Sequence, residues 1–299
     1  MKQLVILSGK GGTGKTSLTA AFAHLAHAHS LPLVIADTDV DAANLELVLS
    51  PSVVETHNFI GGEAAMIDPL RCEGCGICQQ VCRFEAISTQ ESIYQVDPIA
   101  CEGCAACMYR CPVEAIKMIA QFAGTWSRST SPYGALFHAA LRPAQENSGK
   151  LVKLVKQQAR LLALDEKVPL VLVDGPPGIG CPVISAVSGA DLALIVTEPT
   201  AAGIHDMERA LQMTRHFRVP ALVCINKADI YPQGAQQIEV YCQKGNIEMV
   251  GKIPFDPMVT KAMVNGKPVT AYAAESPASR AMTDVWQSVK RHLSLSQGF

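Results

Sequence analysis

The sequence lacks the features of a secreted, membrane-spanning or nucleic-acid-binding protein. No charged-then-apolar leader precedes the first predicted strand and no run of about 18 apolar residues occurs, so we expect neither a signal peptide nor integral membrane association. Lys and Arg number 25 against 27 Asp and Glu, and no basic block occurs, so we expect no nucleic-acid partner. Cysteines outside two short runs are scattered, which excludes a secreted disulfide framework and favours the reducing cytoplasm.

Charged residues are also few, at 17% of the 299 residues, while hydrophobic residues make up 48%. This composition predicts an ordered globular protein rather than a disordered one. The chain is long enough for one substantial core and one small additional module.

Two cysteine runs repeat one spacing, C-x2-C-x2-C-x3-C, over residues 72–82 and 101–111. In such runs three thiolates bind one 4Fe-4S cluster, and the fourth cysteine crosses to the other cluster. Paired C-x2-C is also typical of zinc sites, but zinc needs no third cysteine at the next spacing. The pattern therefore predicts two 4Fe-4S clusters. The expected ligands are Cys72, Cys75, Cys78 and Cys111 for cluster 1, and Cys101, Cys104, Cys107 and Cys82 for cluster 2.

On these runs, residues 62–120 resemble a bacterial two-cluster ferredoxin, and we place the module at 61–121. Arg83 stands where the first run of such ferredoxins usually carries proline. We expect four isoleucines to pack around the clusters: Ile77, Ile87, Ile116 and Ile119. Two segments are expected to join the module to the rest of the chain, Gly61-Gly62 and residues 124–134, because glycine, serine and threonine are frequent there.

A second motif follows the apolar run at residues 4–7 and precedes a predicted helix from about residue 17 to 29. A glycine-rich loop between strand and helix lets backbone N–H groups surround nucleotide phosphates. We expect Lys15 to reach the β- and γ-phosphates and the Thr16 hydroxyl to bind Mg²⁺. The nucleotide-binding residues of this loop are Gly9, Lys10, Gly11, Gly12, Thr13, Gly14, Lys15, Thr16 and Ser17.

Lysine directly after the first glycine is typical of the deviant P-loop of the MinD/ParA/Mrp superfamily, which includes the nitrogenase iron protein. The chain resembles this superfamily, and its nucleotide-binding domain resembles that of cobyrinic acid a,c-diamide synthases. The resemblance implies that Lys10 contacts the nucleotide of a partner subunit, much as an arginine finger does. ATP hydrolysis would then require a homodimer and be slow without a partner protein.

Strands alternating with helices predict an α/β fold with a doubly wound, mostly parallel sheet, formed by residues 1–60 and 122–299 around an inserted α+β ferredoxin-like module. The superfamily resemblance assigns Asp39 to the attacking water, and Asp37 and Asp39 to the magnesium shell. Asp174, after a predicted strand at 170–173, would hold Mg²⁺ through water. The Gly178 N–H would sense the γ-phosphate.

The base site is predicted from N-K-x-D, which follows the predicted strand at 221–225 and comprises Asn226, Lys227 and Asp229. Many GTPases read guanine with this motif, because the aspartate accepts hydrogen bonds from the base. The superfamily resemblance instead places the asparagine on adenine, so ATP is favoured and GTP is the alternative. Pro254 would complete the base pocket, although residues 253–257 also fit an ordinary strand exit.

Two further features lie in the second half of the chain. Cys181 has an offset from Asp174 that resembles the cysteine with which the nitrogenase iron protein binds a cluster at its dimer axis. A small buried thiol is the interpretation that we favour. Near the C-terminus, one helical face is expected to pack on the core rather than bind a membrane; its residues are Met282, Val285, Trp286, Val289 and Leu293.

These resemblances imply an ATP-gated iron-sulfur protein with ATP, Mg²⁺ and two 4Fe-4S clusters as cofactors. Such a protein would pass an electron to a redox partner, or would assemble or deliver a metallocluster on a client protein. The client would include small proteins of the nitrogenase-cofactor-binding type. The alternative is a ParA/MinD-like positioning ATPase whose clusters are structural or sense redox state.

Overall fold

The computed structural model describes residues 1–90, 93–142 and 147–295, which form two compact units. The larger unit comprises Met1–His57, Trp126–Ala140 and Ser148–Phe299. The smaller unit comprises Asn58–Thr125 and Leu141–Asn147. The inserted module expected at 61–121 falls within the smaller unit, which begins earlier, ends later and takes in a second short segment.

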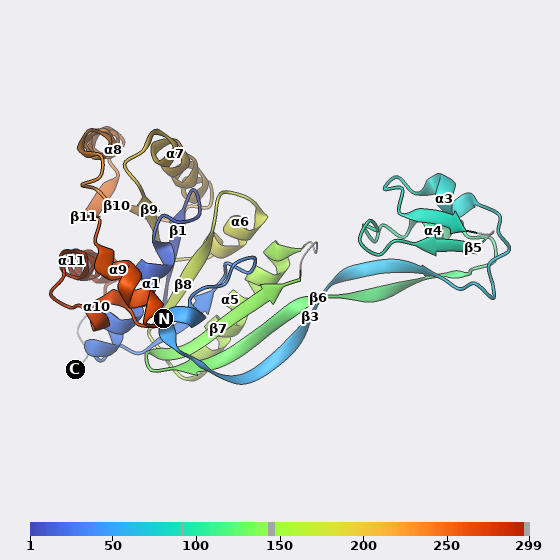
Figure 1. Ribbon diagram of the computed structural model, residues 1–299, viewed down its shortest axis with the longest axis horizontal. Helices are drawn as coiled ribbons and strands as arrows, with labels where there is room; N and C mark the ends of the chain where they lie inside the picture. The colour runs from blue at the N-terminus through green and yellow to red at the C-terminus, as the bar shows by residue number, and fades with distance from the viewer. Residues whose placement is uncertain (91–92, 143–146, 296–299) are drawn as a thin grey trace. The chain divides into compact units, whose positions relative to one another are not determined.

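The larger unit is built on parallel strands in the order β11-β10-β9-β1-β8-β2-β7, and the sheet continues through β6 and β3 (Figure 1). Residues of β1, β2, β8, β9 and β10 are buried almost throughout, because helices cover both faces of a doubly wound sheet. The large, mostly parallel sheet confirms the predicted α/β class. The parallel strands are β1 Lys2–Ser8, β2 Leu33–Asp37, β7 Gly134–Leu141, β8 Leu170–Pro177, β9 Leu192–Thr197, β10 Ala221–Asn226 and β11 Glu248–Ile253.

Alternate residues of one strand enter different hydrophobic clusters, as the pleat of a strand requires. On β10, Leu222 and Cys224 join the cluster that contains α1, whereas Val223 and Ile225 join the one that contains α7 and α8. Helices therefore cover both faces of the sheet. Their bounds are α1 Lys15–Ala28, α2 Glu46–Leu49, α5 Ser148–Asp165, α6 Cys181–Val187, α7 Ala201–His216, α8 Pro232–Lys244, α9 Pro257–Val264, α10 Val269–Tyr272 and α11 Pro277–His292.

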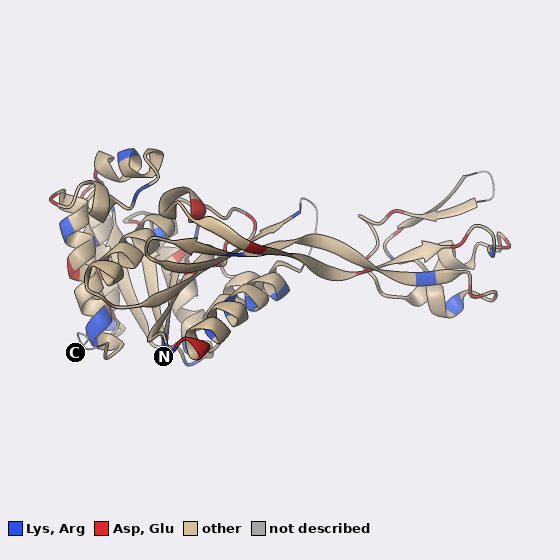
Figure 2. Cartoon of the chain, turned by 90° about the horizontal axis from the view of Figure 1, so that it is seen from below, with Lys and Arg blue, Asp and Glu red and all other residues tan. Residues whose placement is uncertain are grey.

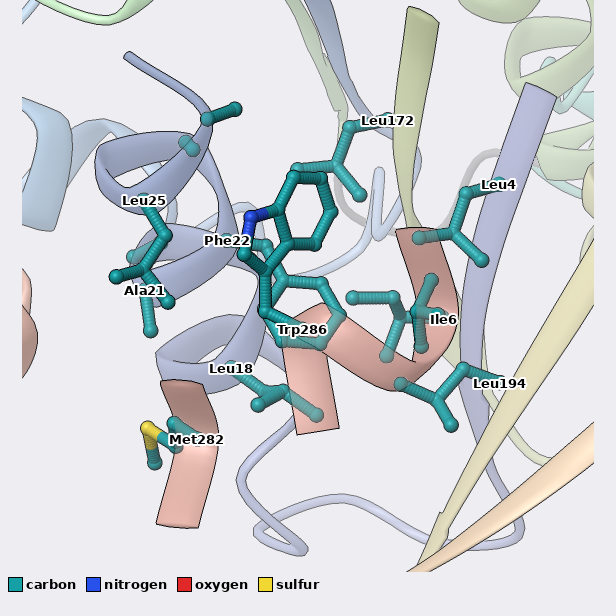
Figure 3. Close-up of a cluster of buried hydrophobic side chains, with 14 of the residues drawn as sticks. Leu4, Ile6, Leu18, Ala21, Phe22, Leu25, Leu172, Leu194, Met282 and Trp286 are labelled. Atoms are coloured by element: carbon teal, nitrogen blue, oxygen red, sulfur yellow. The ribbon is translucent and has the colours of Figure 1, made fainter. Parts of the chain in front are cut away.

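The largest buried side chain of this core is Trp286 of α11, which lies against Phe22 of α1 with ring centroids 5.0 Å apart (Figure 3). The predicted apolar face of α11 is buried in the same cluster, together with Leu293 just after the helix. This confirms that the C-terminal helix packs on the core. Among the described helices, none is both long enough and apolar enough to cross a bilayer.

The smaller unit has two short helices and a hairpin around a small apolar core. Each helix contains the third cysteine of a run and ends at the fourth, so Cys82 and Cys111 are their C-caps. The internal repeat seen in the sequence is thus also a structural repeat. The elements are α3 Ile77–Val81, β4 Ile87–Gln90, β5 Ile93–Val96 and α4 Ala106–Arg110.

The two segments expected to join the module to the rest of the chain lie in strands: Gly61-Gly62 lies within β3 Ser52–Ile67, and most of 124–134 lies within β6 Ile116–Ser131. Pairing with neighbouring strands satisfies their backbone groups and overrides the weak strand preference of glycine. One expectation about this region was wrong: Ile119 is 37% exposed and lies outside the apolar core that contains Ile87 and Ile116.

Candidate nucleotide and cluster sites

The glycine-rich loop connects β1 to α1 and depends on glycine at two positions. Gly12 and Gly14 have φ of 78° and 92°, a region that L side chains rarely adopt. A Cβ on Gly14 would overlap the side-chain amide of Asn226, whose Nδ2 donates to the carbonyl oxygen of Thr13 at 2.7 Å. The structure therefore brings the predicted base-site asparagine against the predicted phosphate loop.

The predicted magnesium ligands meet at the C-terminal ends of β2 and β8. Asp174 accepts hydrogen bonds from Thr16 Oγ1 at 2.8 Å and from Thr19 Oγ1 at 3.0 Å. Burial raises the pKa of Asp174 to about 6, although the positive charge of Lys15 and the two hydroxyls oppose this shift. An anionic carboxylate beside a hydroxyl is the ligand set that Mg²⁺ prefers.

Asp37 stands directly across from Asp174 in the register of β2 and β8, and it is fully buried. It accepts hydrogen bonds from the backbone N–H groups of Leu45 and Asp39, each at 3.1 Å. Burial and the neighbouring Asp174 carboxylate raise the pKa of Asp37 well above its usual range. Two adjacent buried carboxylates favour a cation between them, so the donor set fits Mg²⁺.

Asp39, the residue expected at the attacking water, is half-buried at the start of the loop after β2. Burial raises its pKa, Lys15 opposes the shift, and Asp41 adds to it. The positive charge of Lys15 opposes the shift at both Asp39 and Asp174, so the predicted phosphate lysine lies near two of the three predicted metal-side carboxylates.

Lys10 forms an ion pair within its own chain, with its Nζ 3.2 Å from Glu198 Oε2. Lys227 Nζ donates to Glu198 Oε1 at 2.6 Å and to the carbonyl oxygen of Gly12 at 3.4 Å. Burial raises the pKa of Glu198, but the hydrogen bonds from Lys227 and Lys10 outweigh it, so the pKa is lowered overall. The carboxylate thus stays ionised and holds both lysines.

Other residues predicted to bind the nucleotide make hydrogen bonds or contacts within the chain. Asp229 Oδ1 accepts from the backbone N–H of Phe255 at 2.6 Å, which brings the N-K-x-D segment beside Pro254. The Gly178 N–H donates to the carbonyl oxygen of Ser8 at 3.1 Å. Ser17 is placed on α1, and its hydroxyl contacts Met263 Sδ at 3.4 Å.

In the smaller unit, the four cysteines expected at cluster 2 line one small cavity of about 20 Å³. The cavity walls are otherwise mainly apolar, with Ala65, Ile87 and Val96 among them. The backbone of the cavity wall also contacts a thiol, because the Ala65 N–H donates to Cys101 Sγ at 3.4 Å. An apolar cavity with several thiols and an N–H···S bond suits an iron-sulfur cluster.

The cysteines expected at cluster 1 also gather around one apolar cluster, which contains Cys72, Cys78 and Cys111. Burial raises the pKa of the Cys78 thiol, and nearby Cys72 and Cys75 raise it further. The Ala115 N–H donates to Cys111 Sγ at 3.3 Å. The thiols of this set therefore lie near one another, and the backbone again supplies an N–H···S bond.

Over residues 1–90, 93–142 and 147–295, no group of three or more His, Cys, Asp or Glu converges as it would around a single metal ion. At Asp37 and Asp174, Mg²⁺ would take further ligands from phosphate and water.

A family model described as the CobQ/CobB/MinD/ParA nucleotide binding domain matches residues 4–269. The chain belongs to this family. It is therefore a MinD/ParA-type ATPase. A relative across nearly the whole chain is an uncharacterized protein of Methanocaldococcus jannaschii, 31% identical over 291 residues, with 97% of each chain covered.

Two further likenesses are more distant. An iron-sulfur cluster carrier protein of Pyrococcus abyssi is 23% identical over 319 residues, which cover 99% of this chain and 88% of that protein. The fold is similar to that of the septum site-determining protein MinD of Pyrococcus horikoshii complexed with Mg-ADP, with a TM-score of 0.61 and 18% identity over 98% of each chain.

In this MinD/ParA-type ATPase, sequence reasoning missed Glu198 and Thr19 and misjudged Cys181. Glu198 follows β9, which pairs with β1, so strand order could have placed it beside the loop that leaves β1. Thr19 lies one helical turn after Thr16 and therefore faces the same carboxylate. Cys181 is exposed at the start of α6 rather than buried, because a helix N-terminus next to a surface loop has no layer above it.

Proposed function

We propose that this ATPase carries two 4Fe-4S clusters and couples them to the closing of an ATP-bound homodimer, for electron transfer or metallocluster delivery to a partner protein. The observation that carries the proposal is the cavity lined by Cys82, Cys101, Cys104 and Cys107. These four residues come from both cysteine runs, as the exchange of the fourth ligand between clusters requires.

Cluster chemistry would be set by groups that the smaller unit already supplies. When bound, the clusters supply one-electron transfer. Cys101 and Cys111 each accept a backbone N–H···S bond, from Ala65 and Ala115, and such bonds raise the reduction potential of a cluster. Cys75 and Cys104 are exposed, so solvent reaches one thiol of each set.

At the nucleotide site, each step is assigned to a residue of the chain. Lys15 would hold the β- and γ-phosphates, while Thr16 and Asp174 hold Mg²⁺. Asp39 would orient the water that attacks the γ-phosphate. Lys10 would leave Glu198 and contact the phosphates bound by the partner subunit, where it neutralises charge as the terminal phosphate separates.

ATP would act by binding the closed dimer better than the open one. To shift the population from nearly all open dimer to nearly all closed dimer, ATP must bind the closed dimer about 5.5 kcal/mol more tightly than the open one. Phosphate contacts made by Lys10 only in the closed dimer are one source of this difference, because charge-assisted contacts contribute about 1.5–3 kcal/mol each.

A chain of contacts within the larger unit leads from the magnesium site to β6, a strand whose first half belongs to the smaller unit. Leu45, whose N–H binds Asp37, precedes Glu46, which lies 3.3 Å from Nδ1 of His138 on β7. Nε2 of His138 lies 2.9 Å from Ser129 Oγ on β6, and β6 continues without a break to Ile116. Movement after β2 on nucleotide binding would therefore act on a strand that reaches the cysteine region.

An anaerobic EPR redox titration of the reconstituted protein, with Mg-ADP and with a non-hydrolysable ATP analogue, tests the proposal. Two 4Fe-4S signals are expected, and the potential of at least one should differ between nucleotides. Cys104→Ala should lose about half of roughly eight irons per chain, whereas Cys181→Ala, also an exposed cysteine but outside both runs, should lose none. Equal iron loss in the two variants would contradict the ligand assignment.

Cluster delivery is a second candidate, favoured by the relatives that are named iron-sulfur cluster carrier proteins. It predicts equal potentials in both nucleotide states and ATP-dependent transfer of a cluster to an apo 4Fe-4S acceptor protein. Lys15→Ala should abolish this transfer while the iron content stays unchanged. Unchanged potentials without transfer would leave a positioning ATPase with structural clusters.

A further inference from the structure

A groove between α5 and α6 in the larger unit is lined almost entirely by hydrogen-bond donors. Its volume is about 360 Å³. Three lining side chains are cationic, two are amides and two are hydroxyls, and within the described residues no carboxylate lines it. The lining consists of Gln3, Lys153, Lys156, Gln157, Arg160, Ile184, Ser185 and Ser188. None of these residues belongs to the nucleotide or cysteine sites.

The cations come from one face of α5. Lys153, Lys156 and Arg160 are spaced by three and four residues, which places them on the same side of a helix. Figure 2 shows the Lys and Arg positions following one another along this helix, with acidic residues only at its end. In the described part of the chain, neither Lys153 nor Arg160 lies within 4 Å of a carboxylate oxygen.

Lys156 fixes a buried positive charge at the base of the groove. It is 9% exposed, and its Nζ donates to the carbonyl oxygens of Ser185, Ala186 and Ser188 at the end of α6, at 2.5, 3.1 and 2.6 Å. Burial and the nearby charges of Arg160 and Lys153 lower its pKa to about 8. Lys156 is thus compensated by carbonyl oxygens, whereas Lys153 and Arg160 place two further charges beside it, and an anion bound near them would relieve the repulsion among the three.

An independent observation comes from Gln3 of β1, which also lines the groove. Its side chain is only 2% exposed, and its Nε2 has no hydrogen-bond partner among the described residues. A buried amide donor without a partner is uncommon and unfavourable. The carboxylate of Asp191 accepts from the Gln3 backbone N–H at 2.8 Å and lies 3.6 Å from Lys2 Nζ.

We propose that this groove binds a small oxyanion, a phosphate group or a carboxylate. Arg160 and Lys153 would bind its oxygens directly, because a guanidinium offers paired donors and both side chains are exposed at the rim. Gln157 adds an amide donor. Lys156 has all three N–H groups occupied by carbonyls, so it contributes its charge from below.

The position of the groove gives such binding a consequence for the ATPase. Lys156 holds the C-terminal end of α6, and α6 begins three residues after Gly178, the predicted γ-phosphate sensor. An anion would bind α5 and α6 together at the far end of this helix. Its occupancy would therefore be linked to the nucleotide state.

The test is isothermal titration calorimetry of the reconstituted full chain saturated with Mg-ADP, which keeps the phosphate loop occupied. Inorganic phosphate and malonate are titrated separately at constant ionic strength, with chloride as the reference anion. One saturable site per chain is expected. Lys153→Gln and Arg160→Gln should each weaken binding about tenfold, the equivalent of one charge-assisted hydrogen bond.

Lys150→Gln is the matched control, because Lys150 is on the same helix but does not line the groove. It should leave binding unchanged. Saturation by phosphate alone identifies a phosphate site, and saturation by both probes identifies a general oxyanion site. The proposal is overturned if neither probe saturates, if chloride competes as well as phosphate, or if the control weakens binding as much as Lys153→Gln and Arg160→Gln do.

Discussion

Replacing Glu198 by Gln should make the ATP-bound dimer close more readily. In the structure this carboxylate holds Lys10, which the proposed mechanism needs in the partner's site. Closing must therefore break one cis ion pair in each subunit. Glu198→Gln removes the charge that holds the lysine and leaves a side chain of almost the same size.

The expected size of the effect follows from exposure. The Lys10 side chain is 41% exposed and that of Glu198 is 13% exposed, so the pair is screened by solvent on the lysine side. Such pairs contribute about 0.2–1 kcal/mol, and two are broken per dimer, so the closing constant should rise about 2- to 30-fold. Basal ATP hydrolysis should rise with it.

Analytical ultracentrifugation with a non-hydrolysable ATP analogue at saturating concentration measures the closing constant. Saturation matters because Glu198 also holds Lys227, whose release could weaken nucleotide binding. Glu239→Gln is the control, since it breaks a surface ion pair with Lys252 far along the chain. Equal dimerisation of Glu198→Gln and wild type, or an equal gain in the control, would refute the reasoning.

Three other expectations concern the core, the loop and pH. Trp286→Ala should lower the free energy of unfolding by about 3–5 kcal/mol in urea titrations, and a loss below 1 kcal/mol would show that the core collapses around the gap. Gly14→Ala forces a Cβ into the Asn226 amide at φ 92°, so affinity for a fluorescent ADP analogue should fall at least about tenfold; unchanged affinity would show that the loop can shift. Burial lowers the pKa of His138 below 6.5, although Glu46 opposes this shift, so the unfolded chain binds a proton at higher pH than the folded chain. The free energy of unfolding should therefore fall as pH decreases below 6.5, by at most about 1.4 kcal/mol per pH unit. His138→Gln should flatten that slope.

Short-range patterns in the sequence predicted much of the fold. The strands that flank the predicted magnesium and base residues are where their apolar runs place them, since burial on both faces demands continuous hydrophobic residues. The face of α11 that contains Trp286 was predicted from helical spacing and is buried. Glycine content at 61–62 did not indicate that this segment is a strand, because strand pairing between distant segments outweighs local preference.

The sequence by itself determined which chemistry is available: the glycine loop with its two lysines, the aspartates after buried strands and the two cysteine runs are all local spacings. Tertiary structure alone decided how distant residues combine. Glu198 reaches Lys10 because β9 pairs with β1, and Lys156 lines the same groove as Gln3 because α5 packs against β8, which pairs with β1. Such pairs are set by strand order and helix packing, which bring together residues more than 150 positions apart that no local pattern relates.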